Sequence, residues 1–120
     1  MRRLAVCILF AVVACSPGTE SDGFVLDEWA ISGPEHLDAE VDTITVENSG
    51  EWSHTLVVTT EGGHVVAASG LIESGASTTL GVALEPGAYV FSCRIVAQDD
   101  EGALSDHYER GMSRGVVVEA

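Results

Sequence analysis

The ten residues LEPGAYVFSC, at positions 84–93, carry the clearest structural signal in this chain. Their Pro-Gly pair is typical of a turn. After it, larger side chains alternate with smaller ones, as in a strand with one face against a core. The alternation places Tyr89, Phe91 and Cys93 on the same face, which we predict to be the core face. The stretch therefore predicts a turn followed by a β-strand that ends on a buried cysteine.

Similar short runs, rich in valine and threonine, follow one another along the rest of the chain. Turn formers separate them, and the Glu-Gly-Gly at 61–63 is typical of a tight hairpin. Several short strands at this spacing are typical of a β-sandwich or barrel. The polar segment Ala97–Ser113 breaks the pattern, and we expect a long loop there. The predicted strands are Phe24–Ile31, Val41–Glu47, His54–Thr60, His64–Ala68, Ser77–Leu84, Ala88–Ile95 and Val116–Glu119.

Length and charge limit the classes of protein that fit. The chain has 120 residues, enough for one domain, and we expect a monomer. It carries 5 basic residues, all arginine, against 19 acidic ones, for a formal net charge of −14. Binding nucleic acid needs clustered cations, so we expect no nucleic-acid partner. The negative charge fits two roles, steering a basic partner or keeping the protein soluble.

The first residues are typical of an export signal. Arg2 and Arg3 precede a short apolar run at 4–13, which is too short to span a bilayer and leads to Ala14 and Cys15. A small residue directly before this cysteine resembles the lipobox of bacterial lipoproteins. The resemblance implies a signal peptide at 1–14, a lipidated Cys15 with a flexible tether at 15–22, and a domain at 23–120. That domain would be held at the extracytoplasmic face of the cell envelope.

Two other readings of this N-terminus are an ordinary secretory signal cut nearby and an uncleaved anchor. If the lipobox is real, Cys7 leaves with the signal and Cys15 carries lipid, so Cys93 is the remaining thiol. An unpaired thiol is unusual in an exported domain. Its position alone leaves three roles open for Cys93: a buried packing residue, a metal ligand or a reactive thiol.

Three other side chains complete a candidate donor set with Cys93. His54 lies upstream at the start of a predicted strand, and His107 and Met112 follow downstream at His-x4-Met spacing. Two imidazoles, one thiolate and one thioether suit copper, whose blue sites use a His₂Cys plane with a weak axial Met. Calcium and magnesium prefer oxygen ligands, and zinc gains little from a thioether.

Three stretches of the sequence resemble the plastocyanin-like cupredoxins, over roughly residues 24–120. The asparagine and glycine of 46–50, followed by His54-Thr-Leu-Val-Val, are similar to the family's N-x-G and H-x-L/V element. Residues 84–93 are similar to its PG-x-Y-x-F-x-C strand. Residues 107–112 and 115–118 are similar to its H-x4-M loop and closing strand.

This resemblance implies an all-β, Greek-key β-sandwich that binds one copper ion at a type 1 site. The implied ligands are His54, Cys93 and His107, with Met112 as the axial thioether. The implied function is single-electron transfer to a redox partner protein, without enzymatic activity. Two alternatives are a copper storage or delivery protein and a metal-free interaction module of the same fold.

The chain departs from the family pattern between two of the implied ligands. Thirteen residues separate Cys93 from His107, where plastocyanin-like members have only a few. Lengthening a loop costs little free energy, so the insert could loop out and return His107 to the same place. The alternative is a site with a changed geometry, potential or metal.

Overall fold

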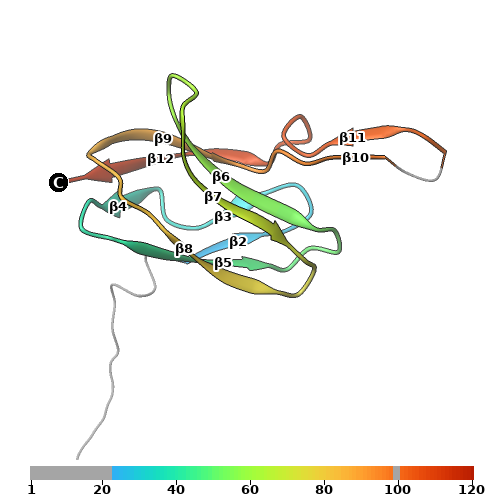
Figure 1. The fold of residues 1–120 in the computed structure, drawn as a ribbon, viewed down its shortest axis with the longest axis horizontal. Coiled ribbons are helices and arrows are strands. Elements are labelled where there is room, and N and C mark those ends of the chain that lie inside the picture. Colours follow the sequence, from blue (N-terminus) through green and yellow to red (C-terminus); the bar gives the residue numbers. More distant parts are fainter. Residues whose placement is uncertain (1–22, 99–100) are drawn as a thin grey trace, which may run out of the picture.

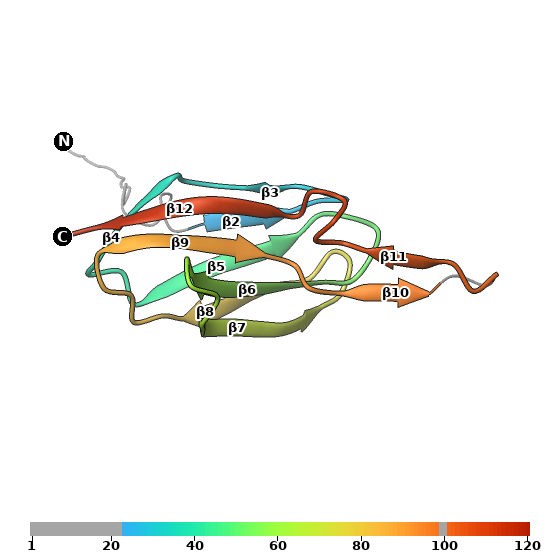
Figure 2. The same ribbon diagram turned by 90° about the horizontal axis from the view of Figure 1, so that it is seen from above.

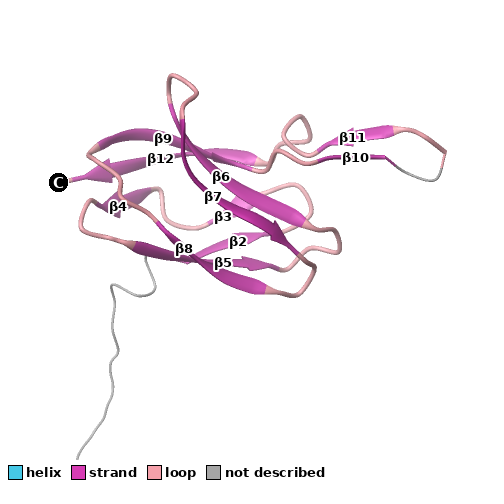
Figure 3. Cartoon of the chain, in the orientation of Figure 1, coloured by secondary structure: helices cyan, strands magenta, loops and turns pink. Residues whose placement is uncertain are grey.

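The computed structural model describes residues 23–98 and 101–120, and the strands account for its regular structure (Figures 1 and 3). The signal peptide, the lipidated Cys15 and the tether predicted from the sequence lie outside these residues. Within the described ranges, no helix is long and apolar enough to cross a bilayer. The all-β prediction for the domain is confirmed.

Two sheets face each other, and a separate two-stranded ribbon extends from one end (Figures 1 and 2). The five-stranded sheet has the order β4 (His36–Asp38), β12 (Ser113–Glu119), β9 (Gly87–Ser92), β6 (His54–Thr60) and β7 (Val65–Ile72). The four-stranded sheet has the order β3 (Ile31–Ser32), β2 (Gly23–Leu26), β5 (Thr43–Asn48) and β8 (Ser77–Gly81). The ribbon pairs β10 (Val96–Gln98) with β11 (Leu104–Asp106).

Most neighbouring strands are antiparallel, but each large sheet also contains one parallel pair. These pairs are β2 with β5 and β12 with β4. The predicted hairpin at 61–63 joins β6 to β7. Gly63 there has a φ of +93°, which a residue with a side chain rarely adopts.

The core lies between the two large sheets and follows from alternation along the strands. Ile44 and Val46 of β5 face inward, as do Leu56 and Val58 of β6, and all four are fully buried. The rings of Phe24 and Phe91 meet at a centroid distance of 4.8 Å and join the two sheets. Two polar residues also face inward. Asn48 is the last residue of β5, and His54 is the first residue of β6.

Three predictions about local structure were wrong. The single strand expected at 24–31 is broken by a turn in which the Asp27 N–H donates to the Ala30 carbonyl, 3.1 Å away. The long loop expected at 97–113 contains β11 and part of β10, whose three-residue strands are too short to give a periodic signal. The third is a missed strand: none was predicted at 36–38, where the structure has edge strand β4, with the side chain of His36 exposed.

Candidate metal centre

The four predicted ligands lie where strands begin or end. His54 opens β6, Cys93 directly follows β9, His107 directly follows β11, and Met112 directly precedes β12. Because β6 and β9 are adjacent and antiparallel, the start of one lies beside the end of the other. The topology therefore brings His54 and Cys93 to the same end of the sandwich.

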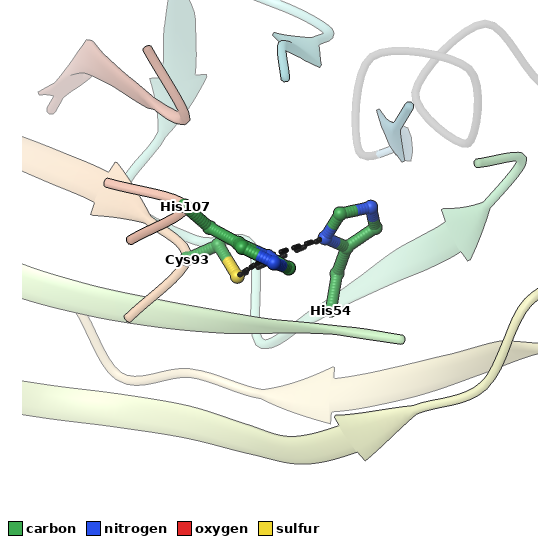
Figure 4. Close-up of side chains that lie close together, drawn as sticks. All are labelled: His54, Cys93 and His107. Carbon is green, nitrogen blue, oxygen red and sulfur yellow. Dashed lines mark hydrogen bonds between the residues drawn. The ribbon is translucent and has the colours of Figure 1, made fainter. Parts of the chain in front are cut away.

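Three of these side chains converge on one point inside the protein (Figure 4). The Nδ1 atoms of His54 and His107 are 3.2 Å apart. The Cys93 Sγ lies 3.5 Å from the His107 Nδ1 and 3.9 Å from the His54 Nδ1. All three side chains are buried. The insert between Cys93 and His107 therefore does return His107 to the thiol.

The size of this triangle fits one metal ion. The point equidistant from three atoms separated by 3.2, 3.5 and 3.9 Å lies about 2.1 Å from each of them. Zinc, a first-row ion, binds imidazole nitrogen at about 2.0–2.1 Å and thiolate sulfur at about 2.3 Å. The three donors could therefore hold a first-row ion with little movement of the backbone.

Met112 is fully buried and is tied through its backbone to two of the predicted ligands. Its N–H donates to the His107 carbonyl at 3.1 Å, and its carbonyl accepts from the Cys93 N–H at 3.0 Å. These bonds close the His-x4-Met loop against the end of β9. The backbone of Met112 is therefore fixed beside the residues that supply the imidazole and the thiol.

The ribbon explains how His107 returns across the insert. The pairing of β10 with β11 brings the chain back antiparallel, and the His107 N–H then donates to the Ile95 carbonyl at 2.9 Å. The Asp106 carboxylate accepts from the N–H groups of Tyr108 and Glu109, at 3.0 and 3.2 Å. This carboxylate fixes the turn that follows and so orients the loop that carries His107.

The N-x-G element, residues 48–50, helps to position the ring of His54. Asn48 is fully buried, and its Nδ2 donates to the carbonyls of Trp52 and Ile72 at 2.8 and 2.9 Å. Its Oδ1 accepts from the Gly50 N–H at 2.9 Å. A Cβ at Gly50 would lie 3.1 Å from the His54 Nε2 and from the Asp27 backbone, so a side chain here would need the ring or this backbone to shift by a few tenths of an ångström. Sequence reasoning missed this role of Asn48, although its place in the inward-facing series of β5 was a usable signal.

Thr55 contacts Cys93 and Trp29 contacts His107, and neither contact was predicted from the sequence. The Thr55 N–H donates to the Cys93 Sγ at 3.4 Å, which stabilises negative charge on the sulfur. The ring of Trp29 meets that of His107 edge to face at 5.1 Å, and the Arg110 guanidinium lies 4.6 Å from the Trp29 ring centre. Trp29 packs against the rim of the core and at the same time covers His107, which is 1% exposed.

Both histidines of the site favour the neutral form. Burial lowers the pKa of His54, and the nearby His107 lowers it further. Glu28 and Asp27 act in the opposite direction and raise this pKa. Burial also lowers the pKa of His107, with Arg110 adding to the lowering and Asp106 and Glu28 opposing it. Neutral imidazole is the form that binds a metal. Within the described part of the chain, the buried Nε2 atoms of both rings have no hydrogen-bond partner. In this part of the chain, the protein therefore leaves one buried nitrogen of each imidazole without a hydrogen bond.

These pKa shifts predict that the metal-free protein loses stability in mild acid. An unfolded histidine titrates near 6.5, so below that pH the unfolded state binds more protons than the folded state. We therefore expect stability to be lost as the pH falls below about 6.5. Urea unfolding at several pH values measures this. His107→Gln should flatten the dependence more than His64→Gln, which replaces an exposed histidine outside the site. Equal pH dependence in the two variants would contradict the prediction.

No family model matches the sequence, and a search of curated proteins also finds no match. Solved structures do match in three dimensions. An azurin from Methylomonas sp. strain J aligns with a TM-score of 0.61 and 15% identity, over 82% of this chain and 96% of its own. A reduced rusticyanin aligns with a TM-score of 0.57 and 16% identity, over 81% and 78%. A purple cupredoxin from Nitrosopumilus maritimus aligns with a TM-score of 0.52 and 18% identity, over 81% and 98%.

These matches cover most of this chain, at sequence identities too low for a sequence search to find. The protein therefore has the cupredoxin fold, as the sequence predicted. The likeness concerns the fold alone. The assignment of a function depends on the converging side chains of this chain.

Proposed function

We propose that this protein binds one copper ion at a type 1 site and carries single electrons. The convergence of two imidazole Nδ1 atoms and one thiol sulfur, within 3.9 Å of one another and buried, is the observation that supports this most. His54, Cys93 and His107 would be the strong ligands, and Met112 the weak fourth. This donor set suits copper better than zinc or the alkaline-earth ions.

The surroundings of the donors favour electron transfer over catalysis. When bound, copper supplies a one-electron couple between Cu(II) and Cu(I). The chain holds the donors from the ends of β6 and β9 and from a loop closed by backbone hydrogen bonds. A close-packed setting of this kind resists rearrangement, and small rearrangement favours rapid electron exchange. The proposed four ligands leave no evident open position for a substrate, so we propose a carrier and not an enzyme.

Export and anchoring belong to the same proposal. The apolar run at 4–13 and the Ala14-Cys15 pair support a lipoprotein signal. Acyl chains on Cys15 would hold the domain at the extracytoplasmic face of a membrane. Its redox partner would then meet it at that surface.

Addition of Cu(II) to the purified protein tests the proposal. We expect an intense visible thiolate-to-copper band that saturates at one equivalent, and fast reversible one-electron cycling at an electrode. Absence of the band would contradict a type 1 site. A band without reversible cycling would instead favour copper storage or delivery.

The substitution Met112→Leu should raise the reduction potential of the copper protein. Leucine keeps the volume of this buried side chain but replaces a weak axial donor with an apolar group, and the loss of electron donation to the ion destabilises the more highly charged Cu(II). Each tenfold loss of preference for Cu(II) raises a one-electron potential by about 59 mV. Voltammetry of the two proteins at one pH measures the change. An unchanged or lower potential would contradict the axial role of Met112.

A further inference from the structure

The turn between β2 and β3, residues 27–30, lies beside both histidines of the metal centre. The ring of Trp29 in this turn meets the His107 ring edge to face at 5.1 Å. On the other side, a Cβ at Gly50 would lie 3.1 Å from the backbone of the turn and 3.1 Å from the His54 Nε2. Gly50 therefore lies against the turn and the His54 ring together. One short segment from outside the predicted ligand set thus packs beside two of the ligands.

Glu28 connects this turn to the loop that follows β5. Its carboxylate accepts a hydrogen bond from the Glu51 N–H. The Ser49 N–H donates to the Leu26 carbonyl, directly before the turn, at 2.8 Å. These two bonds hold the residues on either side of Gly50 against the same segment. A hydrogen bond from an N–H to a carboxylate is charge-assisted and stronger than one between neutral groups, and Glu28 is half-buried. The carboxylate is therefore fixed in its position near the site.

The charge of Glu28 acts on both imidazoles. Burial lowers the pKa of His54 and of His107, and Glu28 opposes the lowering at each ring. A carboxylate that raises the pKa of a histidine stabilises positive charge at that ring. Two neutral imidazoles and one thiolate would leave one more positive charge in the site with Cu(II) than with Cu(I). A fixed negative charge at this distance therefore stabilises the oxidised form more than the reduced form.

We propose that Glu28 is a positioning residue of the metal centre, which holds the 27–30 turn against the loop that leads to His54 and stabilises Cu(II) through its negative charge. The inference rests on the proposed function, since it concerns the copper ion of that site. It has two parts that can be measured separately. The hydrogen bond to the loop exists in the metal-free protein, whereas the charge acts on the reduction potential.

The substitution Glu28→Gln separates the charge from the hydrogen bond. Glutamine keeps the length of the side chain and an oxygen that can accept from the Glu51 N–H, but it carries no charge. We expect the preference of the site for Cu(II) over Cu(I) to fall about tenfold, which raises the potential by about 59 mV. Glu28→Asp keeps the charge, so its potential should lie closer to that of the unsubstituted protein. Voltammetry of the copper-loaded proteins at one pH and one ionic strength measures these potentials.

Glu85→Gln is the matched control, because it removes the same charge at the other end of a strand. Glu85 is exposed and lies shortly before β9, whereas Cys93 directly follows the opposite end of β9. Its substitution should change the preference for Cu(II) less than about twofold, since distance and solvent screen the charge. Equal shifts of potential in Glu28→Gln and Glu85→Gln would overturn the electrostatic part of the inference.

Amide hydrogen exchange of the metal-free protein tests the positioning part without copper. Glu28→Ala removes the acceptor of the Glu51 N–H, so this amide should exchange at least about tenfold faster. Glu28→Gln should keep most of the protection, because the acceptor oxygen remains. An unchanged exchange rate of the Glu51 amide in Glu28→Ala would overturn the positioning part.

The two measurements distinguish a failure of this inference from a failure of the proposed function. If the unsubstituted protein forms no visible copper band, the proposed function is lost, and the effect of Glu28 on Cu(II) is lost with it. If the band forms and Glu28→Gln leaves the potential unchanged, the proposed function stands and Glu28 has no electrostatic role in it.

Discussion

The variant Cys93→Ser should show no intense visible band when Cu(II) is added. The band requires a thiolate bound to copper, and a serine hydroxyl is a far poorer donor with no comparable charge transfer. Within the described residues, Cys93 is the free cysteine, and its sulfur faces the Nδ1 atoms of His54 and His107. Absorption spectra with increasing Cu(II) measure the band, and we expect its complete loss.

The neighbouring Ser92 provides the control for this variant. Ser92 is buried on the same segment, but its hydroxyl accepts from the Arg94 Nε at 2.9 Å and it is not among the converging donors. Ser92→Ala should therefore keep the band. A band that survives in Cys93→Ser would have to come from another thiol, either Cys7 or Cys15, and would remove the basis of the copper assignment.

Two of the candidate ligands, Cys93 and His54, lie on strands whose alternating side chains are visible in the sequence. Alternation along β9 places Cys93 on the core face after Tyr89 and Phe91, and the structure buries all three. His54 likewise opens an alternating strand whose inward positions are Leu56 and Val58. The alternation of side chains along a strand shows directly which residues share one face of the sheet. It therefore predicted strands and placed His54 and Cys93 on core faces, whereas the cupredoxin fold and the full ligand set were implied by the resemblance to the family.

The resemblance implied that His107 is a ligand, but the route by which it returns could not be predicted from the sequence, because it depends on pairing between short segments. Each ribbon strand has three residues, and their composition includes Gln98, Ser105 and Asp106. Such strands give no hydrophobic pattern, and their register is set by geometry that local propensity does not encode. For the same reason the cover that Trp29 provides to His107 becomes visible only in three dimensions.

For Asn48, the sequence identifies a motif but not the structural role of the residue within it. The sequence marks 48–50 as a turn, and the resemblance marks it as part of a family element. The structure adds that Asn48 is an inward-facing residue of β5, which must satisfy its own amide inside the core. It does so by binding the loop that leads to His54, so one buried side chain links the strand, the loop and the site.

The substitution Asn48→Ala should strongly destabilise the protein and loosen the metal centre. It removes the partners of the Trp52 and Ile72 carbonyls and of the Gly50 N–H. A buried polar group left unpaired costs about 1–3 kcal/mol, so we expect the free energy of unfolding to fall by at least about 3 kcal/mol. Urea unfolding of the copper-free protein measures this loss. The copper affinity should fall as well, because the loop that holds His54 loses its anchor.

Ser49→Ala is the matched control for Asn48→Ala, since it changes the next residue of the same turn. Ser49 is exposed, and its hydroxyl makes one long hydrogen bond, 3.4 Å to the Leu26 carbonyl. Its loss should change the free energy of unfolding by less than about 0.5 kcal/mol, as is usual for surface substitutions. If the two variants were equally stable, the hydrogen bonds of Asn48 would contribute little to the fold. The N-x-G element would then act on His54 through the close approach of Gly50 alone.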